Sequence, residues 1–270
     1  MSRWQPKRIR RKLFLITLLL LVWLFCSGEA RAGDLSDRLV QFPQWEGKPP
    51  VDVAEGDLAY PTWMAGTWKM RTVLIDMVAP LAPEIITPGF EGNRQYLNRP
   101  VDCLVKFVPA TPRHFNRFLP QLKQSAPEIV SDRAYNGLSL ARAYLGDEAV
   151  KAVKVDPDNP NRQITILRGD RQLVSTITAR ATESPSADKF VTSEIFQQVF
   201  RGTTQPFLNE VETTTAYSQV EEDNEAVITA NQVTAIYLSS RDPDYFKALN
   251  RPVALYRYQL TFTPKVAEHG

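Results

Sequence analysis

Histidine and cysteine are almost absent from this chain of 270 residues, which contains two of each. His114 and His269 are the only candidate imidazole bases, and no Gly-x-Ser-x-Gly motif accompanies them. A serine or cysteine nucleophile normally needs a histidine base, and protein zinc sites need histidine or cysteine ligands. Cys26 lies in the apolar N-terminal stretch, so Cys103 is the single thiol after it and no disulfide is expected. We therefore expect a protein that is not an enzyme, with no metal site and no cofactor.

Positive charge is scarce outside the first 32 residues. The whole chain has 32 lysines and arginines against 30 acids, but seven of the bases and only one acid lie in residues 1–32. The remainder carries 25 bases and 29 acids, a formal charge of −4. Nucleic-acid binding depends on a basic surface that neutralises phosphates. We therefore expect no nucleic acid among the partners.

Residues 1–32 have the pattern of an export signal. Six bases in residues 3–12 precede thirteen uncharged, mainly apolar residues at 13–25, and Ala30-Arg31-Ala32 follows as a cleavage motif. Thirteen helical residues span about 20 Å, which is less than the ~30 Å of a bilayer core. The pattern predicts a signal peptide cleaved before Gly33, and an uncleaved membrane anchor is the alternative. Both place the protein across a membrane from the cytosol.

The chain after the leader is long enough for one sizeable core. Leu35, Leu39 and Phe42 follow Asp34 at helical spacing, which predicts a short amphipathic helix. Prolines and glycines then form a linker. We expect residues 33–60 to hold the helix and linker, and residues 61–270 to form one domain.

A period of two dominates this domain. In residues 173–180, for example, Ile177 and Ala179 alternate with Thr178 and Arg180. Strict alternation with short turns is typical of an antiparallel sheet with one wet face, and Gly169-Asp170 is a hairpin signal. We expect an all-β fold of eight or nine strands, either a single up-and-down barrel or a curled sheet. The strand-like runs are 68–71, 101–108, 164–166, 173–180, 189–200, 207–219, 226–238 and 253–263.

An insertion, 77–149, interrupts the strands. Ala134, Leu138, Ala141 and Leu145 form one helical stripe that ends at Gly146, and this helix is expected to cover or plug the mouth of a barrel. The proline-rich apolar loop at 80–90 either packs over the barrel or contacts a partner or membrane surface.

Gly66-Thr67-Trp68 opens the first long strand after a short helix and a linker. This resembles the Gly-x-Trp signature of the lipocalins. The resemblance implies that Trp68 closes one end of the barrel and packs against an arginine near the last strand, which would be Arg257 or, less simply, Arg251. The chain departs from the family in its greater length, in the missing disulfide and in the missing Thr-Asp-Tyr motif.

The leader, the Trp63–Trp68 strand opening and the Arg133–Gly146 segment together resemble a family of unassigned function. That family is exported to the thylakoid lumen in cyanobacteria and plastids. The resemblance implies a lumenal or periplasmic location, a service role toward photosynthetic complexes, and no assigned catalytic residues.

Two groups of acidic residues are candidate polar sites. Glu194 shares a strand face with Phe190 and Phe196, so it is either a buried carboxylate or, if the opposite face is buried, a surface residue. Glu210 and Glu212 lie on one face of another strand. They either belong to a solvated face or, if that face points inward, anchor a ligand.

These features lead to one expected function and one alternative. The barrel is expected to bind an apolar small molecule (a lipid, pigment or quinone), with Trp68 closing its base and Tyr256 and Tyr258 lining its wall. Glu194 or Glu210 would anchor a polar group of the ligand. The alternative is a structural or assembly accessory protein for a photosynthetic or other membrane complex, with a barrel filled by its own side chains.

Overall fold

An antiparallel sheet with a concave and a convex face dominates the computed structural model of the protein. The structure describes residues 33–110, 127–202, 206–222 and 225–265. The expected signal peptide 1–32, His114 and His269 lie outside these residues. In the part of the chain that is described, no helix is long and apolar enough to cross a membrane.

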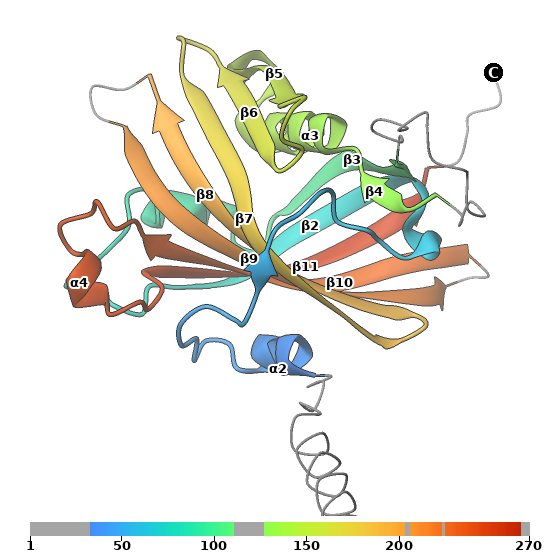
Figure 1. The fold of residues 1–270 in the computed structure, drawn as a ribbon, viewed down its shortest axis with the longest axis horizontal. Helices are drawn as coiled ribbons and strands as arrows, with labels where there is room; N and C mark the ends of the chain where they lie inside the picture. Colours follow the sequence, from blue (N-terminus) through green and yellow to red (C-terminus); the bar gives the residue numbers. More distant parts are fainter. Residues whose placement is uncertain (1–32, 111–126, 203–205, 223–224, 266–270) are drawn as a thin grey trace, which may run out of the picture. The chain divides into compact units, whose positions relative to one another are not determined.

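The sheet has the strand order β4-β3-β2-β11-β10-β9-β8-β7-β6-β5, and β1 pairs with β7. Because β4 and β5 do not pair with each other, the sheet curls without closing, as a half-barrel (Figure 1). This confirms the all-β, curled antiparallel sheet. The described strands outnumber the eight or nine expected, because β1 and β4 are too short to show an alternating pattern and a bulge between Val150 and Ala152 breaks the alternation of β5. The strands are β1 (Asp52–Val53), β2 (Gly66–Val78), β3 (Pro100–Pro109), β4 (Ile129–Ser131), β5 (Val150–Val155), β6 (Arg162–Leu167), β7 (Gln172–Ser186), β8 (Lys189–Arg201), β9 (Phe207–Glu222), β10 (Glu225–Leu238) and β11 (Ala254–Pro264).

Helix α2 (Asp34–Val40) and the segment after it cover the convex face. Leu39, Phe42 and Trp45 form a buried cluster with residues of β10 and β11, among them Val233 and Leu255. The concave face carries a second apolar cluster. The central strands are therefore buried on both faces. This explains why both the odd- and the even-numbered residues of β10 and β11 include buried side chains.

Helix α3 (Arg133–Leu145) lies between the two edges of the sheet, beside β3 on one side and β5 and β6 on the other (Figure 1). Asn136 accepts a hydrogen bond from the backbone N–H of Lys106 (2.7 Å) and donates one to its carbonyl (2.9 Å). Ser139 accepts one from Leu104 N–H (3.0 Å). Side chains of α3 thus satisfy backbone groups of the β3 edge that no strand pairs.

The helix was expected at this position, but the face that it turns inward differs from the expected stripe. Leu145 is exposed, and the side chains directed to the interior include Asn136, Leu140 and Tyr144. The reason is that Asn136 and Ser139 are turned to the β3 edge, where they bond its backbone, and α3 has no fully buried residue.

The proline-rich loop packs against the sheet. Leu81, Ile85 and Phe90 are buried, and Leu81 and Ile85 share a cluster with Val253 at the end of the sheet. The loop was expected either to pack over the barrel or to contact a partner or membrane surface, and its described contacts are with the rest of the domain. Ile86 is a large apolar side chain of the loop that remains exposed (50%).

Candidate functional site

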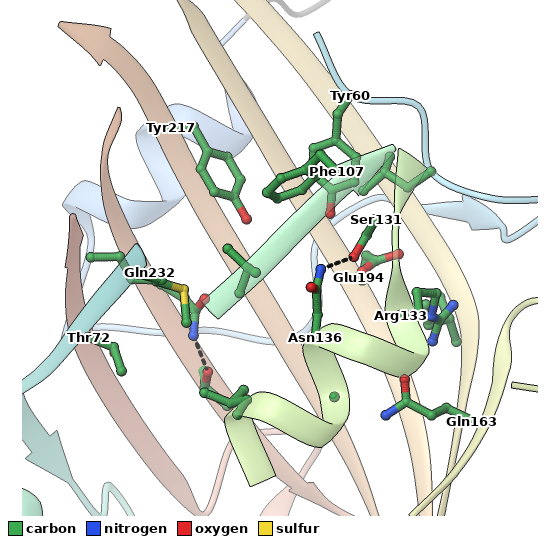
Figure 2. Close-up of a pocket in the computed structure, with 18 of the residues that line it drawn as sticks. Tyr60, Thr72, Phe107, Ser131, Arg133, Asn136, Gln163, Glu194, Tyr217 and Gln232 are labelled. Carbon is green, nitrogen blue, oxygen red and sulfur yellow. Dashed lines mark hydrogen bonds between the residues drawn. The ribbon is translucent and has the colours of Figure 1, made fainter. Parts of the chain in front are cut away.

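A cavity of about 390 Å³ lies on the concave face of the sheet, under α3. Its wall includes residues of β2, β3, β7, β8, β9, β10 and β11, together with the segment before β2 and the inner side of α3. Figure 2 shows Arg133, Glu194 and Gln163 on one side of the cavity, and Thr72 and Gln232 on the other. The interior of this half-barrel is therefore not filled by its own side chains.

Aromatic rings form one wall of the cavity. Tyr60 makes an edge contact with Phe107, with ring centroids 4.8 Å apart, and Tyr217 lies 6.1 Å from Phe262. Tyr60 is held in place because its N–H donates to the carbonyl of Ile129 in β4 (2.7 Å). Such a wall offers large apolar contact area.

Three charged side chains form the opposite corner, which we call the charged corner: Arg133, Arg180 and Glu194. Arg180 in β7 pairs with Glu194 in β8 across the sheet, and Arg180 Nη2 lies 3.2 Å from Glu194 Oε1. The pair is close enough for an ion pair but lacks hydrogen-bond geometry, since Glu194 Oε1 and Arg180 Nε are both buried without a hydrogen-bond partner. Arg133 enters from the first turn of α3, which Asp132 caps by accepting from Tyr135 N–H.

Burial shapes the protonation of these groups. It raises the pKa of Glu194, an effect that Arg180 and Arg133 only partly oppose, and it lowers the pKa of Arg133. Burial also raises the pKa of Tyr60, Tyr217 and Tyr258. All three tyrosines border the cavity in their neutral, protonated form.

Of the five predicted ligand residues, two border the cavity and three do not. Glu194 and Tyr258 border the cavity. Trp68 is buried in the apolar cluster beside it and donates from Nε1 to the carbonyl of Met64 (2.8 Å). Tyr256 lies at one end of the sheet, where its hydroxyl accepts from Asn93 (3.0 Å).

Glu210 lies away from the cavity. The side chains of β9 that point to the cavity are those of odd number, such as Tyr217, whereas Glu210 is on the convex side and pairs with Lys48. Its neighbour Glu212 is buried on the same side against Arg38. The expected solvated face is therefore wrong for Glu212, because the segment after Gly33 covers it.

The expected contact between Trp68 and Arg257 is wrong, because the strand register places the two residues far apart. Gly66 and Trp68 open β2 as expected, but Trp68 is opposite Pro264 of β11, and Arg257 is opposite Asp76. At about 3.3 Å per residue, eight residues of β2 separate the two positions by roughly 26 Å. The Arg257 guanidinium lies instead over the ring of Phe42, 5.5 Å from its centroid.

Sequence reasoning missed Arg180 as an inward residue, because a bulge breaks the alternation of β7. The register shifts between Ile177 and Ala179, so Ile177 and Arg180 both face the cavity although they are three residues apart. A pattern of period two had placed them on opposite faces. Arg133 was missed because only the tertiary fold brings α3 to the cavity.

No group of three or more histidine, cysteine, aspartate or glutamate side chains is arranged to hold a metal ion among the described residues. The charged corner has one carboxylate between two guanidinium groups, which is a poor donor set for a cation.

Comparison of the chain with curated proteins and with solved structures gives no match. A family model described as a domain of unknown function (DUF6816) matches residues 52–266. This range contains all the described strands, α3 and every residue of the charged corner, and it begins after α2. The chain belongs to the DUF6816 family.

Proposed function

We propose that this protein is a non-enzymatic carrier or sensor that binds an apolar small molecule, such as a lipid, pigment or quinone, in the cavity of its half-barrel. The observation that carries the proposal is a cavity of about 390 Å³ with an aromatic wall and a few polar groups. Ligand sites in proteins are typically about 300–1,000 Å³ and are built in this way. The volume also argues against the alternative of a filled barrel.

The proposal includes export to a thylakoid lumen or periplasm. It rests on the basic and apolar pattern of residues 1–32 and on the cleavage motif that follows. A non-enzymatic role rests on the near absence of histidine and cysteine, which removes the usual bases and nucleophiles.

Native mass spectrometry of the protein from its own exported fraction, followed by organic extraction, tests the binding function. We expect a bound organic molecule at close to one per chain. Replacement of Leu140, which borders the cavity from α3, by Trp should fill the cavity and remove this mass. Leu145→Trp is the matched control, because Leu145 lies on the same helix and is 55% exposed but does not border the cavity, whereas Leu140, 38% exposed, does. A folded wild-type protein that carries no organic molecule and takes none up would refute the proposal.

One observation favours the second candidate, an accessory role toward a membrane complex. Phe246 of α4 (Tyr245–Ala248) is 82% exposed and Leu249, directly after it, is 75% exposed. Exposed apolar side chains at one site often mark a contact surface. A photoactivatable crosslinker on Phe246→Cys should then capture a membrane-complex subunit, and the same group on Val53→Cys, also an exposed apolar position, should not.

A further inference from the structure

We propose that the ligand is an amphipathic acid, whose anionic oxygen group binds between the guanidinium groups of Arg133 and Arg180 while its apolar body lies against the aromatic wall. This inference rests on the proposed binding function and specifies the class of ligand. A carboxylate or a sulfonate has the required chemistry.

The charged corner has more hydrogen-bond donors than acceptors. An arginine has five N–H donors and no acceptor. Arg133 donates from Nη1 to the carbonyl of Pro160 (2.9 Å), and this is the one hydrogen bond of its guanidinium among the described residues. Arg133 is half-buried at the edge of the cavity, so its other guanidinium nitrogens remain open to a ligand there.

Arg180 contributes to the same surplus. Its Nη1 donates to the carbonyl of Gly56 (3.1 Å) and its Nη2 to Asn161 Oδ1 (2.6 Å), but its Nε is buried without a partner. Buried polar groups in proteins are almost always hydrogen-bonded, so an orphan donor beside a cavity calls for an explanation. A ligand oxygen that accepts hydrogen bonds is such an explanation.

The acceptors at the corner do not balance these donors. Glu194 is the carboxylate that faces both arginines, and its Oε1 lies 3.2 Å from Arg180 Nη2 without hydrogen-bond geometry. Asp57 also borders the cavity and has an interaction of its own. A carboxylate adds two acceptor oxygens in the planar arrangement that guanidinium groups prefer, and a sulfonate adds three acceptor oxygens, two of which can pair with one guanidinium.

The rest of the cavity fits an apolar body. From the charged corner, the cavity extends toward Phe107, Tyr217 and Phe262. The ring of Tyr60 belongs to this aromatic wall, with its centroid 4.8 Å from that of Phe107 and 6.4 Å from that of Tyr217. A ligand with one anionic end and one apolar end therefore has a single favourable orientation.

Two fluorescent probes with the same ring framework test the inference: anilinonaphthalene sulfonate and phenylnaphthylamine, which lacks the sulfonate. We expect the folded wild-type protein to bind the sulfonate about 10-fold or more tightly than the neutral probe, as charge-assisted hydrogen bonds imply. Arg133→Gln should remove this preference and leave the affinity for the neutral probe unchanged. Arg142→Gln, which changes an arginine on α3 outside the cavity, should leave both affinities unchanged.

The outcomes separate this inference from the function on which it rests. If the wild-type protein binds both probes with equal affinity, or if Arg133→Gln weakens both equally, the cavity binds apolar molecules but the acid specificity is wrong. If neither probe binds and Leu140→Trp changes nothing, the proposed function itself fails. Should Arg133→Gln not fold, the ratio of the two wild-type affinities still decides.

Discussion

Arg38 and Glu212 are 174 residues apart in the chain and form a two-pronged ion pair on the convex face of the sheet. Arg38 Nε lies 2.7 Å from Glu212 Oε1, and Arg38 Nη2 lies 2.8 Å from Oε2. Trp45 Nε1 and Thr214 Oγ1 also donate to this carboxylate, whose side chain is fully buried. The pair fixes α2 to β9 and closes one side of the core.

Glu212→Gln should destabilise the protein by about 3–5 kcal/mol, because it leaves the buried Arg38 without its counter-charge. The measurement is the free energy of unfolding in urea. The double variant Arg38→Met with Glu212→Leu should recover part of the loss, because it removes the unpaired charge but leaves the buried Trp45 Nε1 donor without its acceptor.

The exposed pair of Arg71 and Asp102 is the matched control for this prediction. It has the same two-pronged geometry, at 2.8 and 3.0 Å, but both side chains are open to solvent. Asp102→Asn should therefore change stability far less than Glu212→Gln. Equal effects of the two substitutions would contradict the role of burial.

Glu194 should make stability depend on pH. Because burial raises its pKa in the folded protein, the folded state holds this proton at pH values where the unfolded state has lost it. The free energy of unfolding of the wild type should therefore fall, relative to that of Glu194→Gln, as the pH rises above the ordinary glutamate pKa of about 4.3. Urea titrations of both proteins between about pH 4 and pH 8 measure this difference in the free energy of unfolding. Parallel curves would show that Glu194 titrates normally.

Gly202 should tolerate no side chain. Its φ is +87°, and a Cβ there would lie 2.7 Å from the carbonyl oxygen of Asp170 and 2.8 Å from Arg171 Cα, both backbone atoms. Gly202→Ala should cost about 2 kcal/mol or more in thermal or urea unfolding. Gly169→Ala, in the neighbouring hairpin, has a similar φ of +71° but open space around the Cβ, and should cost only about 1 kcal/mol.

Asn136 should decide how firmly α3 is held against β3. Asn136→Ala leaves the backbone N–H of Lys106 without the hydrogen bond that Asn136 Oδ1 accepts, at an expected cost of about 1–3 kcal/mol. Hydrogen exchange of the Lys106 amide should become faster, while amides in β9 and β10 keep their protection. Unchanged exchange at Lys106 would mean that α3 does not protect this edge.

Much of the fold could be predicted from the sequence. Alternation in residues 253–263 predicted β11, Gly169-Asp170 predicted the β6–β7 turn, where both residues have positive φ, and Gly146 marked the end of α3. These features depend on contacts between residues near each other in the chain. The strand order and the open edge between β4 and β5 depend on contacts between distant residues, so local patterns could not supply them.

The candidate site could be predicted only in part. Glu194 stood out because a charged residue shares a face with phenylalanines, and in the structure it borders the cavity with its side chain 16% exposed. The sequence did not predict Arg180 at the cavity, because one bulge in β7 shifts the alternation. It did not predict Arg133 there either, because α3 reaches the cavity only in the curled sheet. Glu212 was expected either on a solvated face or as a ligand anchor, and it is instead buried against Arg38, since the sequence does not show that α2 covers this face.

The sequence by itself therefore determined most of the long strands, the antiparallel all-β class and the low content of histidine and cysteine, because composition and short-range periodicity are properties of the chain alone. Only the tertiary structure decided which strand faces are buried, that the half-barrel encloses a cavity, and that two arginines meet one glutamate there. These features arise when curvature, register and the packing of α2 and α3 bring distant segments together. Their energies depend on burial, which no local pattern specifies.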